Sequence, residues 1–335
     1  MPAFLKDSFC KIFGNEKNIE LFCDLIGTGR MSHAYLLVGP DGSGKKTLAF
    51  AVAHALARAT SAAGSDALCA KIADRCSADV FLIGIPEDKK TIGVDLVRSI
   101  IPSSVLSPNE LEFKMYIFDN AEKMTASAQN AMLKIIEEPP ANVYIFLLCS
   151  DAASILPTVR SRVQTVKMDL LDSDQIDKYL HSAGVSSDQK KMVFASKICG
   201  GSIGKATELL NDEKEFELYN AARTVVDKQL EKARGGTYYG FLNYVVAAAS
   251  TRDRYERLLD YLALAYRDLT VKKVYENADM RFFDADDAEN AAVRLPGESI
   301  ALCNDAVIKM KNDCYFNVNI NCAAFELAQT LWHAV

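Results

Sequence analysis

Long apolar runs are missing from this sequence of 335 residues. No stretch approaches the roughly 18 consecutive apolar residues that a membrane-spanning helix needs, and the opening MPAFLKDSFCKIF lacks the apolar centre of a signal peptide. Internal repeats and low-complexity linkers are also absent. Apolar residues still make up 50% of the chain and charged residues 24%, which is typical of soluble globular proteins. We therefore expect a soluble protein with a sizeable core and no membrane span.

An excess of positive charge is absent as well. The sequence has 38 Lys and Arg against 44 Asp and Glu, which gives a net charge of −6. Such a chain has no overall basic field that would attract nucleic acid. Residues 211–335 show neither a helix-turn-helix pattern nor a strongly basic face. Any contact with DNA is therefore expected to be local or shared with partner subunits.

Cysteines suited to pairing are not evident either. The nine cysteines are odd in number and scattered, and no signal peptide is expected before them. Disulfides persist in oxidising compartments, whereas free thiols are among the most buried side chains. We expect a cytoplasmic protein with reduced, mostly buried cysteines, namely Cys10, Cys23, Cys69, Cys76, Cys149, Cys199, Cys303, Cys314 and Cys322.

What the sequence does contain is a nearly complete phosphate-binding loop, GPDGSGKKT, at residues 39–47. The apolar run SHAYLLVG before it predicts a buried strand, and the Ala-rich KKTLAFAVAHALARA after it predicts a helix. This order is the context that such a loop requires, because backbone N–H groups at the helix N-terminus bind phosphate oxygens. A glycine-rich turn without a ligand is the alternative. The candidate nucleotide-binding residues of the loop are Gly39, Gly42, Gly44, Lys45, Lys46 and Thr47.

The loop departs from the usual pattern at the position that handles the metal. The pattern G-x-x-x-x-G-K-[S/T] places a hydroxyl, which binds Mg²⁺, directly after the lysine that reaches the phosphates. Here Lys45 is followed by Lys46, whose ammonium would repel a metal ion. The hydroxyl of Thr47 comes one residue late, and one helical step turns a side chain by about 100°. The loop therefore predicts nucleotide binding without efficient positioning of Mg²⁺.

A second departure lies at the end of another predicted strand, KMYIFDNAE at residues 114–122. In an ATPase of this class an aspartate at a strand end, here Asp119, would hold Mg²⁺. The next residue is Asn120, whose amide can orient water but cannot accept its proton. Glu122 is expected in the following helical turn, where a carboxylate favours the positive N-terminus. Two positions thus lack the group that hydrolysis requires.

The order of predicted elements indicates the domain organisation. Strands alternate with helices in the first part of the chain, including the helix SAQNAMLKIIEEPP and the strand NVYIFLLCS. This alternation predicts an α/β fold with a parallel sheet and helices on both faces. Later signals are helical. We expect an α/β nucleotide-binding-type domain at 1–167, a small helical lid at 168–210 and an all-helical C-terminal domain at 211–335.

These motifs identify a family. The chain resembles the bacterial DNA polymerase III clamp-loader subunits, which are AAA+ proteins, and among them the delta-prime type. The resemblance extends over nearly the whole chain through TIGVDLVRSI, ILPTVRSRV, GGSIGKATELL and YFNVNINCAAFELAQTL, and NAMLKIIEEPP with HAYL is highly specific. It implies a hetero-oligomeric ring with gamma/tau and delta subunits that opens a sliding clamp and places it on primed DNA. The C-terminal helical domain would belong to the collar of that ring.

The resemblance also implies a role for Arg162. In the motor subunits a Ser-Arg-Cys motif supplies an arginine finger to the neighbouring subunit's ATP. This chain keeps Ser161 and Arg162 but has Val163 in place of the cysteine. A guanidinium can stabilise phosphate charge in trans without hydrolysis by its own subunit. Pairing of Arg162 with an acidic surface residue is the alternative.

Two further positions depart from the family. Members with zinc carry four cysteines between the loop and the acidic strand, whereas this chain has only Cys69 and Cys76 there. Two thiolates without a nearby histidine do not complete a tetrahedral site, so zinc is not expected. In GSIGKA, Gly204 stands where the motor subunits carry a nucleotide-sensing arginine, and Lys205 follows it as a partial substitute.

Lys46, Asn120 and Gly204 together predict a delta-prime-like subunit that binds ATP weakly or not at all and has little turnover of its own. A gamma/tau-type motor ATPase is the main alternative, and it predicts hydrolysis that requires Lys45. A nucleotide kinase would leave SRV and the helical C-terminal domain without a purpose. A DNA-binding switch in replication initiation would require a basic recognition element. The sequence leaves open whether Mg²⁺ binds.

Overall fold

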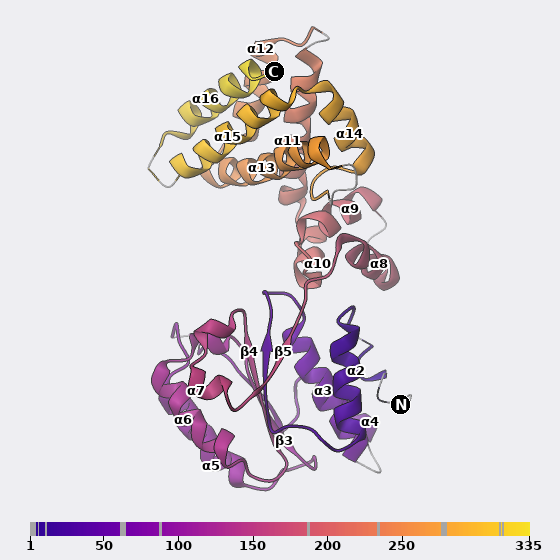
Figure 1. The fold of residues 1–335 in the computed structure, drawn as a ribbon, viewed down its shortest axis with the longest axis vertical. Helices are drawn as coiled ribbons and strands as arrows, with labels where there is room; N and C mark the ends of the chain where they lie inside the picture. Colours follow the sequence, from indigo (N-terminus) through magenta and orange to yellow (C-terminus); the bar gives the residue numbers. More distant parts are fainter. Residues whose placement is uncertain are drawn as a thin grey trace. The chain divides into compact units, whose positions relative to one another are not determined.

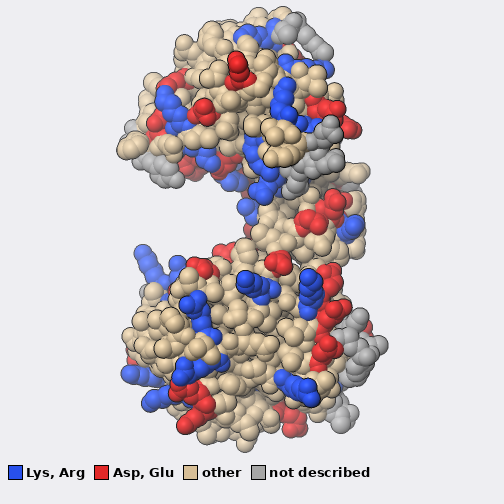
Figure 2. Space-filling model, viewed as in Figure 1, with Lys and Arg blue, Asp and Glu red and all other residues tan. Residues whose placement is uncertain are grey.

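The chain divides into two compact units in the computed structural model (Figure 1). The first comprises residues 1–179 and 201–203, and the second comprises residues 180–200 and 204–335. Among the described residues, no helix is long and apolar enough to cross a membrane. Both signs of charge are present on the visible face of each unit (Figure 2). The structure describes residues 5, 7–10, 12–60, 65–86, 89–185, 188–232, 235–275, 280–314, 316 and 318–335.

A five-stranded parallel sheet forms the centre of the first unit, which confirms the predicted α/β fold with a parallel sheet. The strand order is β2-β3-β4-β1-β5, and Ala34 of β1 lies opposite Ile145 of β4. Because β1, β4 and β3 are neighbours and run parallel, the loops that follow these strands emerge at one edge of the sheet. The strands are β1 (Ala34–Val38), β2 (Val80–Ile83), β3 (Lys114–Phe118), β4 (Val143–Cys149) and β5 (Gln164–Lys167).

Helices cover both faces of this sheet (Figure 1). Successive strand residues point to opposite faces, so Tyr35 and Leu37 pack with α2, α3 and α4. Ala34 and Leu36 pack in the other core, with α5, α6 and α7. The helices of the two layers are α2 (Glu16–Gly27), α3 (Lys45–Thr60), α4 (Ser65–Ala73), α5 (Val94–Val105), α6 (Ala126–Glu137) and α7 (Pro157–Arg160), with the 3₁₀ helices η1 (Ala121–Lys123) and η2 (Ala152–Ser154).

The rest of the described chain is helical, as the sequence predicts. The helix α9 and part of α8 fall in the second unit with the C-terminal helices, whereas the division at 168 and 211 remains a prediction. These helices are α8 (Ser173–Ala183), α9 (Gln189–Ile198), α10 (Ile203–Asn211), α11 (Glu213–Glu231), α12 (Tyr238–Ala248), α13 (Arg252–Val274), α14 (Ala285–Arg294), α15 (Gly297–Asp313) and α16 (Ile320–His333).

An aromatic cluster joins α9 to the long helices of the second unit. Phe194 of α9 is fully buried, and its ring lies 4.9 Å from that of Tyr219 and 5.4 Å from that of Phe216, both on α11. The ring of Tyr219 is in turn 4.6 Å from that of Phe282. Ring contacts at these distances add to the apolar area that the aromatic side chains bury.

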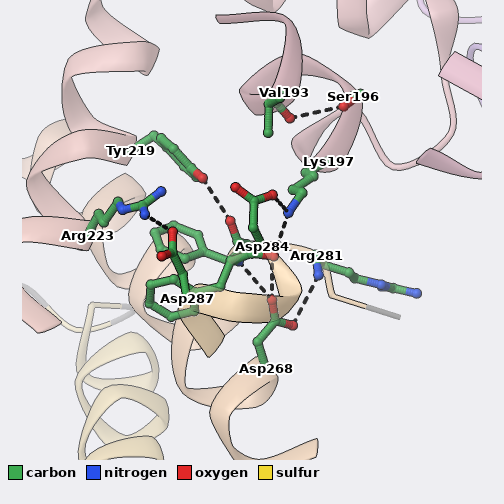
Figure 3. Close-up of polar contacts among 11 residues, drawn as sticks. Val193, Ser196, Lys197, Tyr219, Arg223, Asp268, Arg281, Asp284 and Asp287 are labelled. Atoms are coloured by element: carbon green, nitrogen blue, oxygen red, sulfur yellow. Dashed lines mark hydrogen bonds and ion pairs between the residues drawn. The ribbon is translucent and has the colours of Figure 1, made fainter. Parts of the chain in front are cut away.

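A network of polar contacts surrounds the segment before α14 (Figure 3). The carboxylate of Asp268 is completely buried, and it accepts hydrogen bonds from the backbone N–H groups of Arg281, Phe282 and Phe283 at 2.7–3.1 Å. Lys197 of α9 donates to the carbonyl oxygen of Phe283 and to the carboxylate of Asp284. Residues 281–284 are therefore the point at which α9, α13 and α14 are joined.

Asp268→Ala should lower the free energy of unfolding by about 3 kcal/mol, because three backbone donors, two of them buried, lose their acceptor. Amide hydrogen exchange should become faster at residues 281–283 before it changes in the β-sheet unit. Asp253→Ala is the matched control, since Asp253 lies on the same helix and is exposed. Equal stability and exchange in the two variants would contradict this account of Asp268.

Candidate functional site

Three loops meet at the edge of the sheet where β1, β3 and β4 end. The loop of residues 39–47 begins directly after β1, and the N–H of Gly39 donates to the carbonyl oxygen of Cys149 at 3.1 Å. Asp119 directly follows β3, and Ser150 directly follows β4. The sheet topology thus brings the predicted phosphate loop and the predicted acidic strand end together.

The backbone of the loop has the form that an anion requires. Gly42 and Gly44 have φ angles of +79° and +88°, which glycine adopts without strain. In loops of this kind, backbone N–H groups and the N-terminus of the following helix can bind an anion. The hydroxyl of Ser43 is buried and has no hydrogen-bond partner among the described residues. These donors could bind the oxygens of a phosphate group.

The side chain of Lys45 binds other residues of its own loop. Its ammonium donates to the carbonyl oxygens of Gly39 and Pro40, at 2.5 and 2.9 Å, and lies 3.8 Å from the carboxylate of Asp41. Lys45 can stabilise the loop in this arrangement without a bound phosphate.

Lys46 forms an ion pair with Asp119. The Nζ of Lys46 lies 2.6 Å from Oδ2 of Asp119, and the two side chains are 36% and 22% exposed. This pair joins the two positions that would serve a metal ion, the residue after the loop lysine and the aspartate at the strand end. Thr47 is exposed, and no hydrogen bond joins it to Asp119 among the described residues. The carboxylate that Mg²⁺ would need is therefore already bound to a cation of the chain.

Ser150 is a site residue that the sequence analysis did not identify. Its hydroxyl donates to Oε1 of Glu122 at 2.9 Å, while Oε2 of Glu122 is buried without a partner in the described part of the chain. Burial, together with the charge of Glu122, raises the pKa of the Cys149 thiol to about 11. The signal in the sequence was a hydroxyl directly after a buried strand.

A turn from later in the chain lies against the loop. A Cβ atom placed on Gly42 would lie 1.8 Å from Oγ of Ser202, and a Cβ on Gly39 would lie 2.6 Å from the carbonyl oxygen of Met168. Gly201, beside Ser202, has a φ of +84° and lies against Leu171 in the same way. Part of the GGSIGKA motif therefore packs on the loop within the first unit.

Arg162 lies just beyond α7. Its Nε is 2.8 Å from Oε1 of Glu137, the last residue of α6. Its Nη1 donates to the carbonyl oxygen of Thr158 and to the hydroxyl of Ser161, at 3.0 and 3.2 Å. The Arg162 side chain is 42% exposed. The guanidinium is thus paired with α6 and α7 and also accessible from outside.

The two cysteines that the sequence analysis weighed as zinc ligands differ in environment. Cys69 is buried in α4, and Cys76 is exposed. Burial raises the pKa of the Cys69 thiol, which disfavours the thiolate that a metal needs. Within the described ranges, no group of three or more His, Cys, Asp or Glu side chains is placed to hold a metal ion.

Comparison with known proteins points to one family. Residues 14–172 match the model of the family described as DNA polymerase III, delta subunit. The chain is 34% identical over 146 residues to the delta-prime subunit of Pseudomonas aeruginosa, covering 42% of this chain and 44% of that one. It is 24% identical over 306 residues to the delta-prime subunit of Bacillus subtilis, covering 90% and 91%.

The gamma subunits are also similar. The chain is 28% identical over 211 residues to the DNA polymerase III gamma subunit of Buchnera aphidicola, covering 61% of this chain and 57% of the relative. The chain thus spans less than two thirds of that relative's length. A solved structure of a gamma subunit-related protein from Thermotoga maritima matches 93% of this chain and 98% of its own, with 18% identity and a TM-score of 0.40.

Gly42→Ala should lower the free energy of unfolding by about 1–3 kcal/mol, because the new methyl group meets Ser202 and the residue keeps a positive φ. Gly84→Ala is the control, since a Cβ at Gly84 has open space. Thermal unfolding without nucleotide measures both. A neutral Gly42→Ala would mean that the turn at Ser202 does not pack on the loop.

Proposed function

We propose that the chain is a delta-prime-like subunit of the DNA polymerase III clamp loader. The family match over residues 14–172 and the similarity to delta-prime and gamma subunits support this proposal. The subunit would help to load the sliding clamp onto primed DNA in the cytoplasm and have little or no ATPase activity of its own. The observation that carries this proposal is the ion pair between Lys46 and Asp119.

The ion pair disfavours Mg²⁺ for two reasons. Mg²⁺ binds oxygen ligands at about 2.0–2.1 Å in near-octahedral geometry, and the Lys46 ammonium already occupies Asp119 at 2.6 Å. A divalent cation brought next to that ammonium would also be repelled. The residues present therefore do not fit a Mg²⁺ site. Asn120, in place of a carboxylate, removes the proton acceptor for water.

The loop itself still fits a phosphate group. The positive-φ glycines, the start of α3 and the unpartnered hydroxyl of Ser43 support weak binding of ATP, ADP or phosphate. When bound, a nucleotide would supply phosphate oxygens to these donors. Gly204, in the place of a sensing arginine, removes one further contact. We therefore expect weak binding that gains little from Mg²⁺.

Arg162 would act on the neighbouring subunit. An exposed guanidinium can stabilise the charge of a transferring phosphate on another protein, and its own subunit need not hydrolyse ATP. The partners would be gamma/tau and delta subunits in a hetero-oligomer. Residues 1–167 would form the AAA+ domain, 168–210 the lid and 211–335 the collar.

A gamma/tau-type motor subunit is the second candidate. The similarity to the Buchnera gamma subunit and the retained glycines and Asp119 favour it. It differs from the first candidate in one measurable property, because it requires Mg²⁺-dependent ATP hydrolysis by the chain itself.

The isolated chain should show no Mg²⁺-dependent ATP hydrolysis above background. Lys46→Ser restores the hydroxyl after Lys45 and releases Asp119, so nucleotide affinity should rise on addition of Mg²⁺ in this variant and not in the wild type. Calorimetric titration with and without Mg²⁺ measures both. Lys45→Ala added to Lys46→Ser should abolish the gain. Steady turnover by the wild type that is lost in Asp119→Ala would favour the motor subunit instead.

Arg162→Ala should lower ATP hydrolysis of the reconstituted clamp loader by about 10³-fold at the affected site, because the finger stabilises the transition state. Arg160→Ala is the control, since Arg160 is the exposed last residue of α7 and precedes the motif. Assembly is checked by gel filtration. If the assembly forms and its turnover is unchanged in Arg162→Ala, the assignment of the finger is wrong.

A further inference from the structure

The guanidinium of Arg162 is held by the chain through two of its three nitrogens. Arginine has five N–H donors, one on Nε and two on each terminal nitrogen. The Nε donor faces Glu137, and Nη1 donates to Thr158 and Ser161. No partner for Nη2 occurs in the described part of the chain. The donors that remain available are therefore those on Nη2.

The element that carries Glu137 is firmly placed. Thr125 caps the start of α6 by accepting the N–H of Ala128 at 3.2 Å. Met132, Ile135 and Ile136 of α6 are buried against the sheet. Glu137 therefore extends from the end of a packed helix rather than from a loop. The packing of α6 fixes the backbone position from which the Glu137 carboxylate reaches Arg162.

The start of α7 is attached to the same helix. Gln129 of α6 is buried, and its Oε1 accepts the N–H of Leu156, which immediately precedes α7, at 2.8 Å. Gln129 also donates to the carbonyl oxygen of Ser154 at 3.4 Å. The helix α6 thus contacts the finger segment at both ends, through Gln129 before α7 and through Glu137 after it.

We propose that Glu137 is a positioning residue for Arg162. By binding Nε, its carboxylate restricts the long arginine side chain to orientations in which Nη2 faces away from the chain. Nη2 would then meet the terminal phosphate of a nucleotide held by the neighbouring subunit. This inference rests on the proposed finger role of Arg162 and adds the residue that directs it.

Because the Glu137–Arg162 pair is exposed, its effect on the orientation of Arg162 can be distinguished from its effect on the stability of the fold. Both side chains are more than two fifths exposed, and ion pairs in such surroundings contribute little to folding. Loss of Glu137 should therefore leave the fold intact but allow Arg162 to adopt many rotamers. Restricting a catalytic group to its reactive geometry affects the chemical step more than substrate binding.

In the alternative arrangement, Glu137 would hold Arg162 away from the phosphate of the neighbouring subunit's nucleotide. That arrangement would require Glu137 to bind the edge that a phosphate uses. In the structure Glu137 binds Nε, and the terminal Nη2 remains available. The geometry favours positioning, and the two arrangements predict changes of opposite sign.

The test compares Glu137→Ala, Glu137→Gln and Glu138→Ala in the reconstituted clamp loader. Glu138 is the control, because it is the next residue, carries the same charge and is exposed. Glu137→Ala should lower kcat of ATP hydrolysis about tenfold with little change in KM. Glu137→Gln keeps an acceptor for Nε and should recover most of the activity. Glu138→Ala should match the wild type, and all three should unfold at the same temperature.

A double variant completes the test. Glu137→Ala should cause no further loss when Arg162 is already Ala, because Glu137 acts only through Arg162. An increase in kcat, an equal loss in Glu138→Ala, or a further loss in the double variant would overturn the proposal. A loss in Arg162→Ala without one in Glu137→Ala would overturn it and leave the finger role in place. No loss in Arg162→Ala would overturn the finger role and this inference together.

Discussion

The ion pair between Lys46 and Asp119 is the interaction on which the proposed function of this protein depends. The pair is partly exposed, so it contributes at most about 1 kcal/mol to stability. Its chemical consequence is larger, because a carboxylate that is bound to an ammonium is not available to a divalent metal. Under the proposed function, an ammonium in place of a hydroxyl at position 46 would alter what the whole loop can bind.

The glycines of the loop are needed for packing, whether or not the site hydrolyses ATP. Gly39 lies against Met168 and Gly42 lies against Ser202, and both contacts leave no space for a Cβ atom. A loop of this form is therefore required by packing within the first unit as well as by phosphate binding. Retention of GPDGSG is accordingly weak evidence for hydrolysis. The residues after the glycines decide the chemistry.

The helix α6 connects the two places on which the proposed function depends. It begins shortly after Asp119, at the end of β3, and it ends at Glu137, beside Arg162. The Lys46–Asp119 ion pair thus lies near one end of a packed helix, and the exposed guanidinium of Arg162 lies at the other. Under the proposed function, a change at the first position would not require a change at the second, because α6 is held by its own buried side chains.

The sequence alone determined the α/β sheet, the position of the loop after β1, the acidic end of β3 and the helical character of the later chain. These features are local, since apolar runs, glycines and prolines act on the residues next to them. Only the tertiary structure decided that Lys46 contacts Asp119, that Ser150 contacts Glu122, that Glu137 holds Arg162 and that α9 belongs with the C-terminal helices. These pairs join residues that are distant in sequence, and the order of the strands and the packing of the helices bring them together. The periodicity of one segment carries no information on which distant segment it will meet.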